Sequence, residues 1–158
     1  MAKAREVPGL DGDDPCRVAA ANVVSVRSDE LFEQSVNVLD TSDIERVHDM
    51  RVATRRLRAV LEIFAPCFEP TLHRSVLRDV RSLADALGER RDADVEIALL
   101  EGLLDEAAEA DRGALVALIE ELRVRQAEAN ESLTPYVAPK RLKKLRRRLK
   151  KLVKKAGR

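Results

Sequence analysis

The sequence predicts an all-α protein, an antiparallel bundle of about five to six helices joined by short connections. The composition is typical of helical proteins, because charged residues make up 36% of the chain and aromatic residues only 3%, while proline and glycine occur six times each. The spacing of apolar residues gives a further indication, since they return every three or four positions through most of the chain. No stretch alternates apolar and polar residues as a strand would.

The first two helices have start signals in the sequence. Residues 1–13 contain one proline and two glycines without periodicity, so we expect a disordered N-terminal segment. Asp14 as N-cap and Pro15 at the first helical position predict a helix that runs to about Leu39. Residues 42–45, Ser-Asp-Ile-Glu, have the form of a capping box and predict a second helix that ends before Pro66.

Glycine and proline divide the rest of the chain. A third helix is expected to follow Pro70 and to end at Gly88, placed as a C′ glycine. Asp92 is placed to cap a fourth helix running to about residue 110, or to fix Arg91 in position. A fifth helix covers about residues 115–133. Pro135 and Pro139 bracket a short connector before a last helix over residues 140–155. We therefore expect a helical repeat over residues 14–135 and a basic helical segment over residues 136–158.

A row of cationic residues stands out within the second helix. At about 100° per residue, four side chains fall within an arc of about 80°, opposite an apolar side that includes Leu57 and Leu61. They are His48, Arg51, Arg55 and Arg58. Arginines at these spacings repel one another by roughly a few tenths of a kcal/mol per pair, so the row indicates an anion lying along it. Arg56 lies on a separate flank, and a simple solvated face is the ordinary alternative.

Further cations accompany this row. Arg74, Arg78 and Arg81 form a stripe on the polar side of the third helix, which closes with Asp85. The segment from Ser132 onward carries 12 Lys or Arg residues, and all 28 acidic residues of the chain precede it. The formal net charge of +1 therefore conceals a strongly basic C-terminal segment.

The remaining sequence signals indicate the cellular compartment of the protein. No apolar run approaches the roughly 18 residues of a membrane span, and the N-terminus lacks the hydrophobic core of a signal peptide. We therefore expect a soluble, cytoplasmic protein without a membrane span. Cys16 and Cys67 have neither metal-ligand spacing nor a disulfide pattern, so they are expected to be ordinary thiols in a reducing compartment.

Two motifs stand out in the sequence, VHDMRVATRRLRAVLEIF over residues 47–64 and LADALGERRDADV over residues 83–95. Together they resemble the two motifs of the CHAD family, the conserved histidine α-helical domain. The resemblance covers about residues 15–155. It implies a helical module that binds inorganic polyphosphate and is associated with polyphosphate granules, either alone or fused to a triphosphatase domain.

The resemblance also implies a larger architecture. A complete domain of this family resembles two four-helix repeats, each with its own histidine–arginine helix, around a basic channel. This sequence has one such helix, and its basic C-terminal helix resembles the start of a second repeat. We therefore expect half of the two-repeat architecture, with a homodimer as one way to complete it.

The cationic residues of these segments are the predicted polyphosphate-binding residues, and phosphate or sulfate ions would bind at the same place. No catalytic residue, metal or cofactor is expected. The predicted residues are His48, Arg51, Arg55, Arg56 and Arg58 of the second helix, Arg74, Arg78, Arg81 and Arg91, and Lys140, Lys144, Arg147 and Lys151 of the last helix.

The chemistry of a polyanion favours a binding protein over an enzyme. Binding needs arginine forks and ammonium groups in a continuous track, with no nucleophile or base. A phosphohydrolase would need clustered metal-ligating carboxylates, and the predicted turn at Gly88 separates Asp85 from Asp92 and Asp94. The main alternative is non-specific nucleic-acid binding through the basic C-terminal helix, although few aromatic side chains are available for base stacking. Contact of that helix with an anionic membrane is a further alternative.

Overall fold

The computed structural model describes residues 3–157, and helices account for most of them from residue 16 onward. The helices are α1 (Cys16–Gln34), α2 (Glu45–Ile63), the short 3₁₀ turn η1 (Ala65–Cys67), α3 (Pro70–Glu106), α4 (Glu109–Val137) and α5 (Pro139–Ala156). The described residues include no strand. The predicted all-α fold class, with about five to six helices, is therefore confirmed.

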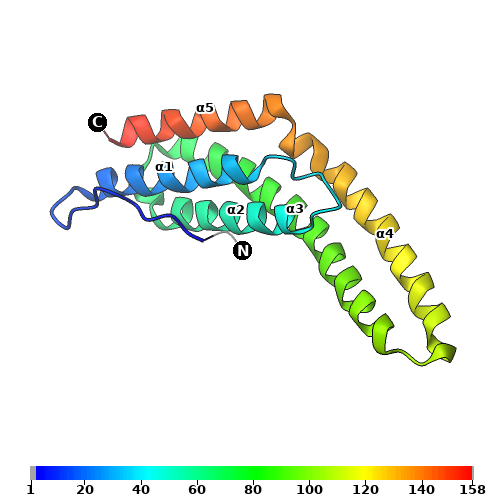
Figure 1. Ribbon diagram of the computed structural model, residues 1–158. Helices are drawn as coiled ribbons and strands as arrows, with labels where there is room; N and C mark the ends of the chain where they lie inside the picture. The colour runs from blue at the N-terminus through cyan, green and yellow to red at the C-terminus, as the bar shows by residue number, and fades with distance from the viewer. Residues whose placement is uncertain (1–2, 158) are drawn as a thin grey trace.

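Four helical segments form the body of the molecule (Figure 1). α1 packs against both α2 and α5, and the first half of α3 also packs against both, so α2 and α5 occupy opposite corners of the body. The second half of α3 and most of α4 leave this body together as a helical hairpin, which we call the α3–α4 hairpin. Two corners of the body thus carry the two most basic helices of the chain.

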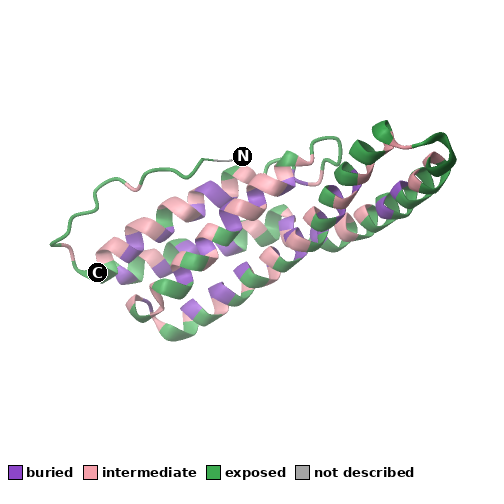
Figure 2. Cartoon of the chain, turned by 90° about the horizontal axis from the view of Figure 1, so that it is seen from below, coloured by how far each residue is buried: buried purple, intermediate pink, exposed green. Residues whose placement is uncertain are grey.

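Apolar residues at helical spacing form the core of the body. Leu57 and Leu61 of α2 are fully buried, and Leu149 and Leu152 of α5 are nearly or fully so. Each such side chain stabilises the fold by about 1.5–3 kcal/mol relative to its exposed state. Figure 2 shows buried residues gathered between the helices of the body, whereas exposed residues dominate the hairpin. This core decides which sides of α2 and α5 face solvent.

The predicted helix end at Gly88 is wrong, because α3 continues through this glycine to Glu106. Leu87 and Arg90, on either side of it, are both completely buried. Packing of these flanking turns outweighs the roughly 1 kcal/mol penalty that glycine brings to a helix interior. Asp92, predicted as the N-cap of a separate helix, consequently lies exposed within α3.

The predicted helix starts also differ in detail. No side chain caps α2, whose N-cap residue is Ile44, so the predicted capping box does not form. Instead, Asp43 Oδ1 accepts the backbone N–H of Glu45 at 3.2 Å. In α1 the N-cap position belongs to Pro15 rather than Asp14. Local hydrogen bonding near a helix start has several near-equivalent solutions, and sequence alone does not choose between them.

The predicted connector bracketed by two prolines is shorter than expected. Pro135 lies inside the last turn of α4, and Ala138 alone separates α4 from α5. Leu133 and Val137 are both buried, so packing on either side of Pro135 keeps this turn helical despite the missing N–H.

The N-terminal segment lies along α1 (Figure 1). The backbone N–H of Arg5 donates to Glu30 Oε1 at 2.6 Å, and the Arg5 guanidinium pairs with Glu33. Arg27 donates to the carbonyl oxygen of Arg5 at 3.0 Å. Arg5 therefore ties part of the segment predicted to be disordered to α1, while Met1 and Ala2 of that segment lie outside the described residues.

Candidate functional site

α2 and α3 run antiparallel, and contacts at both ends fix their register. At one end, His73 Nε2 of α3 lies 2.7 Å from the carbonyl oxygen of Leu61. At the other end, Arg91 of α3 donates to the carbonyl oxygen of Ile44 at 3.3 Å. Residues between these two contacts face one another in reverse order. The cationic row of α2 therefore runs beside the arginine stripe of α3.

One carboxylate shows that the row of α2 is turned toward α3. Glu62 follows Arg58 by one turn on the same arc, and its Oε1 accepts from Arg58 Nε at 3.0 Å. The same oxygen accepts from Arg81 of α3, at 2.8 Å from Nη2 and 3.2 Å from Nε. These hydrogen bonds, first from Arg81 and then from Arg58, hold the pKa of Glu62 below its ordinary value. Glu62 thus links the two cationic helices.

We call the resulting surface the α2–α3 face. Arg55 and the three arginines of the α3 stripe are exposed, while the other members on α2 are half-buried. In the part of the chain that the structure describes, Arg51, Arg55, Arg74 and Arg78 form no ion pair. Seven predicted binding residues therefore share one surface: His48, Arg51, Arg55, Arg58, Arg74, Arg78 and Arg81.

Two further predicted residues have other positions. The Arg91 side chain is only 17% exposed, lies 3.7 Å from Glu45 Oε1 and donates to Ile44, so it holds the start of α2. Arg56 lies on the flank of α2 away from Arg55 and takes part in an interaction of its own. The structure therefore places both at the margins of the α2–α3 face.

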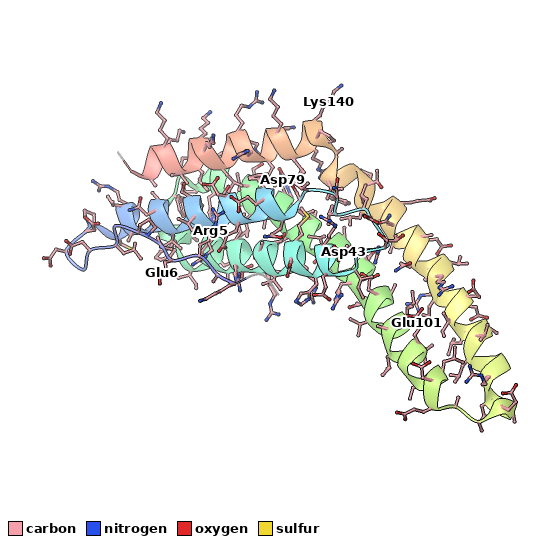
Figure 3. All side chains as sticks on the ribbon, in the orientation of Figure 1. Arg5, Glu6, Asp43, Asp79, Glu101 and Lys140 are labelled. Atoms are coloured by element: carbon pink, nitrogen blue, oxygen red, sulfur yellow. The ribbon has the colours of Figure 1, made fainter. Side chains whose placement is uncertain are left out.

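The predicted residues of α5 form a separate surface. Lys140, Lys144, Arg147 and Lys151 are all exposed, and we call them the α5 surface. Figure 3 shows Lys140 pointing away from the body. Because α2 and α5 occupy opposite corners, the structure does not bring these four residues onto the α2–α3 face.

Other arginines of α5, which the sequence did not single out, anchor it to its neighbours. Arg148 pairs with Asp79 and bonds Ser75, both on α3. Arg146 lies over the Phe32 ring of α1, 5.3 Å from its centroid, with Asp29 at 3.6 Å. Arg146 and Arg148 lie on either side of the leucine stripe of α5. Their position next to this buried stripe is the only sequence signal that could have indicated an anchoring role.

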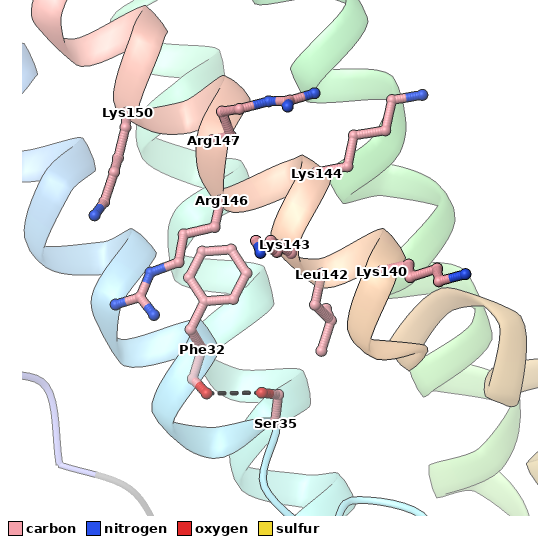
Figure 4. A pocket seen from close by; sticks show the side chains of 9 residues that line it. All are labelled: Phe32, Ser35, Lys140, Leu142, Lys143, Lys144, Arg146, Arg147 and Lys150. Carbon is pink, nitrogen blue, oxygen red and sulfur yellow. Dashed lines mark hydrogen bonds between the residues drawn. The ribbon is translucent and has the colours of Figure 1, made fainter.

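A groove lies between α1 and α5 beside these anchors. It has a volume of about 830 Å³, with Phe32, Ser35 and Leu142 among its lining residues (Figure 4). The other lining side chains are cationic: Lys140, Lys143, Lys144, Arg146, Arg147 and Lys150. The α5 surface therefore continues into a groove of strongly positive charge.

A buried ion pair within the second motif also escaped the sequence analysis. Arg90 and Asp94, one helical turn apart on α3, are both fully buried and pair with each other. Gln126 of α4 donates to Asp94 Oδ1 at 2.7 Å, and Arg90 Nε donates to Asn130 Oδ1 at 3.3 Å. Asn130 in turn donates to the carbonyl oxygen of Leu39 at 3.0 Å. This network joins α3, α4 and the α1–α2 connection where the hairpin leaves the body.

One small cluster of potential metal ligands includes His48 of the α2–α3 face. Glu45, His48 and Asp49 each offer a ligand atom, and these atoms lie within 4.8 Å of one another. The spacing alone would admit a cation, but Arg91 is 3.7 Å from Glu45 and places a competing positive charge there.

No helix of the described residues is long and apolar enough to cross a bilayer.

Comparison with known proteins identifies the family. No curated protein and no solved structure matches the chain. The model of the CHAD domain matches residues 24–158, a span that includes both sequence motifs and every predicted binding residue. Since the match covers most of the chain, the protein belongs to the CHAD family.

Proposed function

We propose that the protein binds inorganic polyphosphate along the α2–α3 face. CHAD domains are associated with polyphosphate binding in general. The observation that carries the proposal is the side-by-side arrangement of two cationic helices. Four of their arginines, Arg51, Arg55, Arg74 and Arg78, have no acidic partner among the described residues.

The chemistry of polyphosphate suits such a surface. It is a linear polyanion, and each phosphate offers several oxygens to the planar fork of an arginine. Two adjacent helices provide cations on both sides of an extended ligand, whereas a single helix provides them on one. Neutralising several phosphates releases counterions, so the affinity should fall steeply as salt rises.

Glu62 has a defined place in this proposal. It holds the side chains of Arg58 and Arg81, and it also competes with phosphate for them. The ligand would therefore bind first to the unpaired arginines and then exchange with Glu62.

The proposal is one of binding without catalysis. Of the carboxylates considered for a phosphohydrolase, Asp94 is buried against Arg90 and faces the hairpin interior. Asp85 and Asp92 are exposed on α3. Nothing in the proposed interaction requires either of them to bind a metal or to transfer a proton.

The test is charge reversal of two unpaired arginines, Arg51→Glu with Arg55→Glu. Each charge-assisted contact contributes about 1.5–3 kcal/mol, so the loss of two should weaken binding of long-chain polyphosphate about 100-fold or more. Affinity would be measured over a salt series, with circular dichroism to show that the helices remain.

The matched control reverses the same number of charges on the α5 surface, as Lys144→Glu with Arg147→Glu. It should change polyphosphate affinity by less than about 5-fold, because only long-range electrostatics are altered. Wild-type affinity in the Arg51/Arg55 variant would refute the proposal. Equal losses in the two variants would refute the assignment to the α2–α3 face.

A second candidate function is non-specific nucleic-acid binding at the α5 surface. The observation favouring it is the separation of this surface from the α2–α3 face, with its lysines exposed at the opposite corner. The same two variants distinguish the candidates. If nucleic acid binds there, the Lys144/Arg147 variant loses affinity for double-stranded DNA while keeping that for polyphosphate.

We also propose that two copies pair through the α3–α4 hairpin, which would complete the two-repeat arrangement. Large apolar side chains are exposed on this hairpin: Val95, Leu99, Leu103, Val116, Leu118 and Val124. Such an accumulation on one projecting element is typical of an interface. Light scattering should give a dimer that Leu99→Lys with Leu103→Lys converts to a monomer. A wild-type chain that stays monomeric at all concentrations would contradict the pairing.

The cellular location that accompanies this function is the cytoplasm, at polyphosphate granules. A fluorescent fusion should co-localise with granules, and the Arg51/Arg55 variant should be dispersed. Diffuse wild-type fluorescence in cells that contain granules would contradict the targeting role.

A further inference from the structure

The two cysteines of the chain lie side by side, although 51 positions separate them. Cys16 is the first residue of α1, and Cys67 is the last residue of η1, between α2 and α3. Their Sγ atoms are 3.3 Å apart and both thiols are free. A disulfide bond measures about 2.05 Å, so the sulfur atoms would need to approach by only about 1.2 Å.

The surroundings of Cys67 hold this arrangement in place. Its backbone N–H donates to the carbonyl oxygen of Phe64 at 2.9 Å. The next residue, Phe68, is buried and stacks on the His73 ring with the centroids 5.9 Å apart. η1 also contacts α1 and α3. The pairing of the thiols thus follows from the packing of this corner of the body.

We infer that Cys16 and Cys67 form a thiol-oxidation site that closes reversibly to an intramolecular disulfide. Cys16 is exposed and Cys67 is half-buried, so Cys16 is the thiol that meets an oxidant in solution. The oxidant class is a small-molecule disulfide such as oxidised glutathione. This inference does not depend on the proposed polyphosphate binding.

The reaction is two successive thiol–disulfide exchanges. The Cys16 thiolate attacks one sulfur of oxidised glutathione, forms a mixed disulfide and expels one glutathione thiolate. The Cys67 thiolate then attacks Cys16 Sγ, closes the protein disulfide and expels the second glutathione. The two protein thiols are oxidised, one glutathione disulfide is reduced, and the two protons pass to the leaving thiolates.

The environment of Cys67 supports this order. Burial, together with the hydrogen bond to Cys16, raises the pKa of the Cys67 thiol. Less of it is therefore thiolate at neutral pH, which disfavours direct reaction with a dissolved oxidant. Attack on an adjacent mixed disulfide is intramolecular and tolerates this smaller thiolate fraction.

Closure would clamp the start of α1 to the corner between α2 and α3. The loop so closed contains the whole of α1 and α2, and cross-linking a long loop removes much of the conformational freedom of the unfolded chain. For a loop of this length and a chain of this size, we expect Tm to rise by about 5–10 °C.

The experiment equilibrates the full chain with reduced and oxidised glutathione at several ratios. Expected results are a mass lower by two hydrogens, loss of both alkylatable thiols, a linked Cys16–Cys67 peptide, and a higher Tm that reductant reverses. Cys67→Ser should accumulate the glutathione adduct on Cys16, and Cys16→Ser should react more slowly than Cys67→Ser.

Other outcomes would overturn the inference. Both thiols could stay alkylatable in excess oxidised glutathione, or the wild-type protein could stop at the glutathione adduct. Disulfide-linked dimers on a non-reducing gel would also contradict an intramolecular disulfide. A disulfide that forms without raising Tm would overturn the clamping of α1. Since none of these readouts involves polyphosphate, failure here leaves the proposed function unaffected.

Discussion

α2 and α5 are both amphipathic helices rich in cations, yet they present their charges differently. In α2 the unpaired arginines lie on the flank beside α3, where a second cationic stripe runs antiparallel to them. In α5 the flanking Arg146 and Arg148 bind acidic residues of α1 and α3, and the exposed lysines have no second cationic helix beside them. The number of charges therefore says less about a binding surface than the position of the apolar stripe, which decides which charges meet another helix.

The largest loss of stability should come from truncating a core leucine, and it should be the same in α2 and α5 because their apolar sides are equally buried. Leu57 of α2 and Leu149 of α5 are 0% and 1% exposed. Leu57→Ala and Leu149→Ala should each lower the free energy of unfolding by about 2–5 kcal/mol, through lost burial and the cavity left behind. Urea titration gives both values. A cost below about 1 kcal/mol at Leu149 would mean that α5 is not an integral part of the body.

A smaller loss of stability should distinguish the arginine that anchors α5 from the outward-facing cations of the same helix. Arg148→Ala removes the pair with Asp79 and the contact with Ser75 on α3, and should cost about 1–2 kcal/mol. Arg147→Ala, the adjacent exposed position, should change stability by less than about 0.5 kcal/mol. Thermal unfolding of the two variants compares them directly, and equal Tm values would contradict the anchoring role.

The same contrast explains what the sequence predicted well. An apolar stripe such as that of Leu57 and Leu61 determines the outward side of its helix, so the row of Arg51 and Arg55 was placed correctly on the surface of α2. The neighbour of that row was not determined, because periodicity identifies a buried side but not the helix that covers it. The lysines of α5 are predicted to bind polyphosphate together with this row, yet they lie at the opposite corner of the body.

The wrongly predicted helix end at Gly88 has a related cause. Gly88 has the local properties of a helix end, but the buried pair of Arg90 and Asp94 beyond it requires an uninterrupted α3. Charged residues are almost never fully buried unless they are paired, and the partners here come partly from α4. The adjacency of Cys16 and Cys67 likewise depends on how the body closes rather than on their spacing in the sequence.

The smallest effect concerns Glu62, the acidic residue that joins the two cationic helices. Arg81 and Arg58 lower its pKa from the ordinary value of 4.5, so its contribution to folding is present above that value and is lost as pH falls through the lowered pKa. Glu62→Gln removes this competitor for both arginines and should strengthen polyphosphate binding by about 2- to 5-fold at neutral pH.

Glu101→Gln is the matched control for this substitution, because Glu101 pairs with Arg123 at 3.1 Å on the hairpin, away from the face. It should leave the affinity unchanged. As acid protonates Glu62 in the wild type, the difference in affinity between wild type and Glu62→Gln should disappear. If Glu62→Gln instead binds more weakly at neutral pH, the carboxylate must orient Arg58 and Arg81 for phosphate rather than compete with it. The α2–α3 face would then depend on a fixed arrangement of its arginines, whereas the α5 surface would depend on charge alone.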